Sequence, residues 1–222
     1  MKKGLKISII GLGYVGLPLA IEFSKLYEVV GFDINNKRIK ALNQYNDITD
    51  ETSSKSLKKA LSKNLKITSL ESDISNSDVF IVTVPTPITE KKIPDLSYLK
   101  SASRTVGSYL KPDNVVIFES TVYPGCTEED CVPILEAESN LSYQKDFHCG
   151  YSPERINPGD KTNTLTKIKK ITSGSSPEIS DFVDELYGSI IKAGTHKASS
   201  IKVAEAAKSV ENVQRDLNIS LV

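Results

Sequence analysis

A glycine-rich segment near the N-terminus has the spacing of a phosphate-binding turn. Gly11, Gly13 and Gly16 form the pattern GxGxxG between an apolar run at residues 7–10 and an amphipathic segment at residues 15–27. Between a strand and a helix, the first glycine allows a tight turn, the second lets the backbone approach a pyrophosphate, and the third lets helix and strand pack closely. The free N–H groups at the start of the helix would then bind the phosphates of a dinucleotide.

An acidic residue at the end of the next apolar run indicates which dinucleotide binds. Asp33 lies 33 − 11 = 22 residues after Gly11, where a carboxylate can accept hydrogen bonds from the adenosine ribose. Its charge repels the 2′-phosphate of NADP, so the sequence predicts NAD. Arg38 could instead serve a 2′-phosphate. Beside Asp33 we interpret it as stacking on the adenine or as a solvated helix charge, and the sequence does not decide between the two.

Three later apolar runs lead into polar segments. Residues 79–84 lead into Pro-Thr-Pro, residues 115–118 into ESTVYPG, and residues 147–150 into YSPERINPGD. Ligands of open α/β sheets sit beyond the carboxyl ends of the strands, so three such ends beside a phosphate-binding turn favour one composite site over ordinary turn chemistry. Glu154 and Arg155 are the best candidates for a catalytic or anion-binding pair, the alternative being a surface ion pair.

Residues 199–222 have the pattern of one long helix. An apolar stripe recurs at helical spacing at Val203, Ala206, Val210, Val213, Leu217 and Leu221. Glu205, Lys208 and Asn212 share a nearly opposite face, which the pattern alone predicts to be a solvent face. A lysine and an asparagine one turn apart could alternatively stabilise an alkoxide or a tetrahedral oxyanion.

The alternation of apolar runs with helix-length segments predicts an α/β fold, a Rossmann-type doubly wound parallel sheet followed by the start of a long helix. We expect an NAD-binding domain over residues 1–198 and a connecting helix over residues 199–222. The predicted strands lie at residues 7–10, 29–32, 65–68, 79–84, 115–118, 147–150 and 168–172, and further helices at residues 36–43 and around 57–61.

Composition narrows the class of protein. The 222 residues allow one to two domains, and 28 basic against 28 acidic residues give no net charge that would attract nucleic acid or an anionic membrane. The basic N-terminus runs directly into the glycine motif, so it is interpreted as a first strand and not as a signal peptide. No apolar stretch is long enough to span a membrane.

The cysteines and histidines have no metal-site spacing. Cys126, Cys131 and Cys149 form no CxxC pair, and His148 and His196 do not complete a zinc cluster with them. We therefore expect no metal, ordinary buried or half-buried thiols, and a reducing cytoplasm as the compartment.

Five segments together resemble the UDP-glucose/GDP-mannose 6-dehydrogenases. They are GLGYVGLPLA, VPTP at 84–87, ESTVYPG at 119–125, YSPERINPGD at 151–160 and KVAEAAKSVENVQRDLNI at 202–219. The SPERINPGD form is most similar to bacterial UDP-N-acetylhexosamine 6-dehydrogenases, which make uronic acids for surface polysaccharides such as capsule. The resemblance implies oxidation of a sugar C6 hydroxyl by two NAD+ through a cysteine thiohemiacetal, in a homodimer built around the long helix.

The resemblance also implies roles for individual residues. Catalytic roles fall on Thr121, Glu154, Lys208 and Asn212: the first two position water or relay protons, and the last two stabilise the oxygen anion. Cofactor contacts fall on Gly11, Gly13, Tyr14, Val15, Gly16, Asp33, Arg38, Val84, Pro85, Thr86, Ser120 and Thr121. Substrate contacts fall on Glu154, Arg155, Ile156, Asn157, Lys208 and Asn212.

One feature of the family is missing from the sequence. The nucleophilic cysteine of the family lies in a GGxCxxxD segment, which does not occur here, and members are roughly twice as long. We therefore expect the N-terminal portion of such an enzyme, which binds NAD without completing the reaction and which dimerises or aggregates through the apolar stripe. The alternatives are a stand-alone NAD-binding or assembly module, or another NAD-dependent dehydrogenase of the hydroxyacid type.

Overall fold

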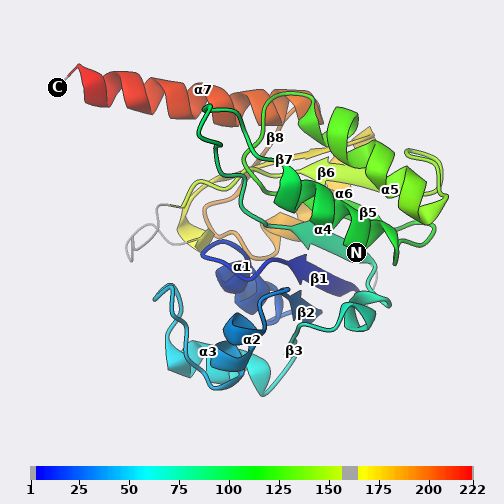
Figure 1. Ribbon diagram of the computed structural model, residues 1–222, viewed down its shortest axis with the longest axis vertical. Coiled ribbons are helices and arrows are strands. Elements are labelled where there is room, and N and C mark those ends of the chain that lie inside the picture. Colours follow the sequence, from blue (N-terminus) through cyan, green and yellow to red (C-terminus); the bar gives the residue numbers. More distant parts are fainter. Residues whose placement is uncertain (1–3, 157–164, 222) are drawn as a thin grey trace.

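A computed structural model describes residues 4–156 and 165–221, which form an α/β structure around one sheet (Figure 1). The eight strands lie in the order β3 (Leu65–Thr68), β2 (Glu28–Phe32), β1 (Lys6–Ile10), β4 (Val79–Val82), β5 (Val115–Phe118), β6 (His148–Tyr151), β7 (Lys170–Gly174) and β8 (Thr195–Lys197). The first six are parallel to one another. This is the strand order of a doubly wound dinucleotide-binding fold, so the predicted fold class is confirmed.

The far edge of the sheet departs from the prediction of a fully parallel sheet. Strand β7 runs antiparallel to β6, and β8 pairs parallel to β7. A parallel return requires a crossover, usually a helix. In the described part of the connection between β6 and β7, the only helix is the three-residue 3-10 turn Leu165–Lys167. The sequence did not predict β8, because three residues are too few to give a strand pattern.

Helices cover both faces of the sheet. On one face α1 (Gly16–Phe23), α2 (Asn36–Asn43), α3 (Ser54–Leu61) and α6 (Pro177–Gly188) contribute to one apolar core, and on the other α4 (Ser97–Gly107), α5 (Val132–Ser139) and the start of α7 (Ile201–Ser220) contribute to a second. All residues of β4 and β5 are buried. This explains why their sequences are apolar without alternation.

The packing of α7 is the reverse of what its apolar pattern predicted. Glu205 is fully buried and Lys208 is 8% exposed, whereas Val210 and Leu217 are 65% and 59% exposed. Only the first part of the helix packs on the sheet, where it contacts β6 and β7, and the rest extends past the sheet toward the C-terminus (Figure 1). The polar face turns inward because the carboxyl ends of the strands offer it polar partners.

The cysteines lie in the core, as expected of ordinary thiols. Cys126, Cys131 and Cys149 are all fully buried. Burial raises the pKa of the Cys149 thiol, and a hydrogen bond with Cys131 together with burial raises that of Cys126. A thiolate is the reactive form of cysteine, so these two thiols are held in the unreactive form.

Among the helices that the structure describes, none combines the length and the apolar character that crossing a bilayer requires.

Candidate functional site

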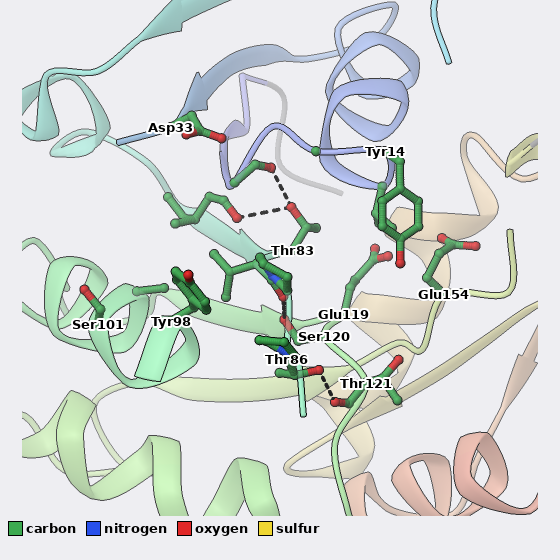
Figure 2. Close-up of a pocket in the computed structure, with 18 of the residues that line it drawn as sticks. Tyr14, Asp33, Thr83, Thr86, Tyr98, Ser101, Glu119, Ser120, Thr121 and Glu154 are labelled. Carbon is green, nitrogen blue, oxygen red and sulfur yellow. Dashed lines mark hydrogen bonds between the residues drawn. The ribbon is translucent and has the colours of Figure 1, made fainter. Parts of the chain in front are cut away.

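A cavity of about 690 Å³ opens at the carboxyl edge of the sheet (Figure 2). The ends of β1, β2, β4 and β5 line it, together with α4, the segment after β6, and Lys208 of α7. It therefore occupies the crevice where an open α/β sheet binds its ligand, between strands whose crossovers run in opposite directions. Most of the polar segments selected from the sequence meet in this pocket.

The glycine turn has the geometry of a dinucleotide cradle. Gly11 has a φ of 94°, which favours glycine. A Cβ on Gly16 would lie 1.9 Å from the carbonyl oxygen of Gly11, whereas a Cβ on Gly13 would meet nothing within 4 Å. Gly16 thus allows the close packing of α1 on the turn. The space beside Gly13 opens on the pocket, where a pyrophosphate can approach the backbone.

A threonine that sequence reasoning missed supports this turn. The hydroxyl of Thr83, directly after β4, donates to the carbonyl oxygens of Gly11 and Ile10 at 2.7 and 3.1 Å. It fixes the glycine turn against the neighbouring strand end. No sequence signal indicates this role, because its partners are main-chain atoms distant in the sequence.

Asp33 lies at one end of the pocket and is held in place by main-chain donors. Its carboxylate accepts the N–H of Leu12 at 2.8 Å and the N–H of Asn35 at 2.8 Å. Asn35 in turn caps the N-terminus of α2. The acid is therefore fixed between the glycine turn and α2, at the position that suits an acceptor for the adenosine ribose.

Replacing Asp33 by asparagine is expected to change the choice between NAD+ and NADP+. The amide keeps an oxygen for the N–H of Leu12, loses the acceptor for the N–H of Asn35, and removes the charge that repels a 2′-phosphate. We expect the ratio of the two dissociation constants to move about tenfold toward NADP+, which corresponds to roughly 1.4 kcal/mol of relieved repulsion. Calorimetric titration of both cofactors measures the ratio, and an unchanged ratio would contradict the assignment of Asp33.

One of the two interpretations of Arg38, the solvated helix charge, is corrected by its surroundings, and the stacking on adenine stays a prediction. The residue is 5% exposed, so it is not a solvated charge. Its guanidinium pairs with Asp47 at 2.7 Å and donates to the carbonyl oxygen of Leu12 at 2.9 Å, and it is not among the residues that line the pocket. Although burial opposes ionisation, hydrogen bonds from Thr49 and Arg38 lower the pKa of Asp47. Arg38 therefore supports the glycine turn from beneath.

The loops after β4 and β5 are joined by two hydrogen bonds. The hydroxyl of Ser120 donates to the carbonyl oxygen of Val84 at 2.6 Å, and that of Thr86 donates to the carbonyl oxygen of Thr121 at 2.6 Å (Figure 2). The pocket is lined by these four residues and by Pro85, Tyr14 and Val15. It is also lined by a group on α4 that the sequence did not select, Tyr98, Ser101, Ala102 and Thr105.

Glu154 is a buried carboxylate in the wall of the pocket. One oxygen accepts the main-chain N–H groups of Arg155 and Ile156 at 2.5 and 2.8 Å, and the other accepts from the ammonium of Lys170 at 2.9 Å. Burial alone would raise the pKa of Glu154, but the charge and hydrogen bond of Lys170 lower it overall. The residue is held ionised with both oxygens occupied.

A second buried carboxylate shares the same lysine. The ammonium of Lys170 also donates to Glu119 at 2.8 Å, and the hydroxyl of Tyr187 donates to the other oxygen of Glu119. Burial raises the pKa of Glu119, whereas the two carboxylates keep the pKa of Lys170 high despite burial. Sequence reasoning quoted Glu119 without giving it a role and missed Lys170 and Tyr187. The only signals in the sequence were that Glu119 directly follows the apolar run at residues 115–118 and that Lys170 lies within the predicted strand at residues 168–172.

The residues after Glu154 do not all turn toward the pocket. Ile156 lines it, but the guanidinium of Arg155 pairs with Glu211 of α7 at 3.0 Å. The side chain of Arg155 therefore pairs with Glu211 in the structure and not with Glu154, and the substrate role of Arg155 stays a prediction. Asn157 lies outside the described residues.

Lys208 reaches the pocket from α7, and Asn212 does not line it. The ammonium of Lys208 donates to the carbonyl oxygen of Glu154 at 2.6 Å. Three residues earlier, the buried carboxylate of Glu205 accepts the N–H groups of Gly125 and Thr127 at 2.5 and 2.9 Å. The face that the helical pattern assigned to solvent thus fastens α7 to the loops of the pocket.

Comparisons with known proteins agree with this geometry. A family model described as the UDP-glucose/GDP-mannose dehydrogenase family, NAD binding domain, matches residues 5–191. The chain is 60% identical to a UDP-N-acetyl-D-glucosamine 6-dehydrogenase of Pseudomonas aeruginosa, covering 99% of this chain and 52% of that protein. It is 52% identical to Protein CapL of Staphylococcus aureus, covering 97% of this chain and 50% of that protein.

Solved structures agree with these sequence comparisons. The structure of a UDP-D-ManNAc dehydrogenase from Pyrococcus horikoshii superposes with a TM-score of 0.90 at 38% identity, covering 98% of this chain and 52% of that one. The chain therefore spans about half the length of the relatives it matches.

Proposed function

Because this chain belongs to the UDP-glucose/GDP-mannose dehydrogenase family and contains its NAD-binding domain, we propose that it is the cofactor-binding part of a nucleotide-sugar 6-dehydrogenase. The proposed substrate is a UDP-N-acetylhexosamine, whose C6 hydroxyl is oxidised to a carboxylate. The proposed product is a precursor of surface polysaccharides, and the proposed compartment of the reaction is the cytoplasm. The observation that carries the proposal is that one pocket holds the glycine turn, Asp33, Thr121, Glu154 and Lys208 together.

The cofactor half of the pocket is built to bind and orient. The glycine turn and the N-terminus of α1 bind a pyrophosphate, and Asp33, fixed by the N–H groups of Leu12 and Asn35, accepts from a ribose hydroxyl. When bound, NAD+ supplies the hydride acceptor for the oxidation of an alcohol. The joined loops at Thr86 and Thr121 hold the far end of the pocket in one shape.

The other half of the pocket offers charge to a reacting oxygen. The ammonium of Lys208, held by the main-chain oxygen of Glu154, is placed to stabilise negative charge on the C6 oxygen. Glu154 is ionised with both oxygens occupied, so its role is to orient and not to take up a proton. Thr121, which lines the pocket, would position water with its hydroxyl. Asn212 is not in the lining of this pocket, so it would act with Lys208 only if the arrangement around α7 changed.

The described pocket contains no cysteine, and the sequence has no GGxCxxxD segment. Mixed with NAD+ and UDP-N-acetylglucosamine, the chain is therefore expected to bind cofactor without sustained formation of NADH. Absorbance at the NADH band follows turnover, and calorimetry follows binding. Sustained turnover by this chain alone would contradict the assignment of the nucleophile to another segment, and activity on small hydroxy acids would favour the other class of dehydrogenase.

A stand-alone NAD-binding or assembly module is the second candidate function. It is favoured if the chain binds NAD+ normally and forms NADH from a UDP-sugar only when a second polypeptide carrying a GGxCxxxD segment is added.

We also propose that two copies associate through the exposed apolar face of α7. Val210, Val213, Leu217 and Leu221 are between 58% and 84% exposed along this helix, and such a stripe favours association. Light scattering is expected to show a concentration-dependent dimer or larger species, and the double substitution Val210→Ser, Leu217→Ser is expected to shift the chain to monomer. The matched control is Ile48→Ser, which removes an equally exposed residue (70%) elsewhere. A wild-type chain that stays monomeric at high concentration would contradict the proposal.

A further inference from the structure

The two buried glutamates that share Lys170 differ in how they are satisfied. Glu154 receives three donors, two of them main-chain N–H groups, and Glu119 receives Lys170 and the hydroxyl of Tyr187. Both carboxyls line the pocket, whereas Lys170 lies behind them. The pair therefore presents two acids of unequal character to the same cavity.

Charge counting indicates that this pair holds one proton. The two carboxylates share the one ammonium of Lys170, all three groups are at most 9% exposed, and the next ammonium, that of Lys208, is bonded to the main-chain oxygen of Glu154. A buried net charge is costly, and like charges that share a site cannot both remain ionised easily. The proton belongs on Glu119, because protonating Glu154 would weaken two main-chain hydrogen bonds as well as the ion pair. The raised pKa of Glu119 and the lowered pKa of Glu154 agree with this order.

The place of Glu119 in the pocket relates it to the nicotinamide. Asp33 marks the adenosine end, and the glycine turn marks the pyrophosphate. The rest of a dinucleotide must therefore extend toward the ends of β4 and β5, where Glu119 lies. Figure 2 shows Asp33 well apart from Glu119, which extends from the end of β5 toward Tyr14 and Glu154.

We propose that Glu119 is a proton-binding site coupled to the charge of the cofactor: it is protonated in the free domain and releases its proton when oxidised, positively charged nicotinamide enters the pocket. Reduced nicotinamide carries no ring charge and leaves the proton in place. The physical cause is that a nearby positive charge stabilises the ionised form of a carboxyl group.

The other titratable groups around Glu119 are the same whether the oxidised or the reduced cofactor binds. In the described structure they are Lys170 on β7, Tyr187 on α6, Tyr151 on β6, Glu154 after β6, Lys208 on α7 and Tyr14 of the glycine turn. All are present whichever form of cofactor binds. Only the added ring charge differs, so a difference in proton release between the two forms reports on that charge.

The same coupling would give the alcohol oxidation a proton acceptor, and this consequence rests on the proposed function. Oxidation of an alcohol breaks a C–H bond and an O–H bond; the hydride goes to the nicotinamide and the proton must go to a base. Loss of the ring charge at that moment raises the proton affinity of Glu119, which lines the pocket and is then ready to take up the released proton. The binding experiment below needs no sugar, so it can fail independently of the substrate assignment.

The test is calorimetric titration of the chain with NAD+, repeated in two buffers of different ionisation enthalpy. An opposite charge lowers a carboxyl pKa by roughly one to three, and the lower bound already gives about half a proton released per NAD+ at the most sensitive pH and about tenfold tighter binding as the pH rises through that window. Titrations with NADH and with ADP-ribose are expected to release none.

Two variants and one control make the test specific. Glu119→Gln is expected to bind NAD+ without proton release, whereas Glu129→Gln, an exposed acid 64% accessible in its side chain, keeps the wild-type release. Tyr187→Phe removes a donor to Glu119 and is expected to move the release to higher pH, which tests the proposal even if Glu119→Gln fails to fold. Equal release with NAD+ and ADP-ribose, or NAD+ binding without release, would overturn the proposal alone. A chain that binds no NAD+ would overturn the cofactor site as well.

Discussion

Replacing Gly16 by alanine is expected to destabilise the fold by about 3 kcal/mol or more and to abolish NAD+ binding. The added Cβ would lie 1.9 Å from the carbonyl oxygen of Gly11 and 2.4 Å from the hydroxyl of Thr83. Because one of these neighbours is main chain, neither turn nor helix can move aside cheaply. The substitution forces α1 away from the strand ends against which it packs. Chemical denaturation measures the loss of stability.

The matched control is the same substitution at Gly13. A Cβ there would meet nothing within 4 Å, so the free energy of unfolding is expected to change by less than about 1 kcal/mol. NAD+ binding is nevertheless expected to weaken at least tenfold, because the methyl group occupies the space through which a pyrophosphate approaches the backbone. Undiminished binding by the Gly13→Ala variant would show that the phosphates do not lie over this turn.

Replacing Lys170 by methionine is expected to cost about 3–5 kcal/mol of stability. The substitution removes the one ammonium between Glu119 and Glu154 and leaves two acids buried together. The wild-type pair of Lys170 and Glu154 stabilises the fold above the ordinary glutamate pKa of 4.5, and this contribution is lost as the pH falls through the lowered pKa of Glu154. The variant should therefore be most destabilised relative to wild type near neutral pH and less so in acid.

Lys197→Met provides the control for this second substitution. Lys197 lies on the neighbouring strand and pairs with Asp181, but the two side chains are 48% and 61% exposed. Surface ion pairs contribute about 0–1 kcal/mol, so the control should unfold almost as the wild type does. If both variants unfold alike, the buried lysine does not compensate the two acids.

Local patterns predicted most of the fold and the cofactor half of the pocket. The helix at residues 36–43 and the strands at residues 65–68 and 115–118 agree with the structure residue for residue. The apolar runs succeed because strands covered on both faces need no alternation. The glycine turn and Asp33 are separated by one strand-helix-strand unit, so spacing alone brings them together.

The parts that sequence reasoning missed depend on partners distant in the chain. Arg38 is buried because Asp47 and the carbonyl of Leu12 surround it, and no periodicity indicates this. Lys170 lies 51 residues from Glu119, and only the sheet order makes them neighbours. The face of α7 was assigned wrongly because hydrophobic periodicity takes no account of polar partners. The start of the helix packs in the apolar core, but Glu205 and Lys208 on its polar face bond main-chain groups of the loops after β5 and β6.

Two polar contacts near the start of α7 connect this helix to the loops of the pocket. Glu205 accepts hydrogen bonds from the loop after β5, and Lys208 donates one to the segment after β6. The remaining turns of the helix extend past the sheet (Figure 1). A helix of twenty residues is about 30 Å long. The outer turns are therefore connected to the walls of the pocket through these two contacts at the start of the helix.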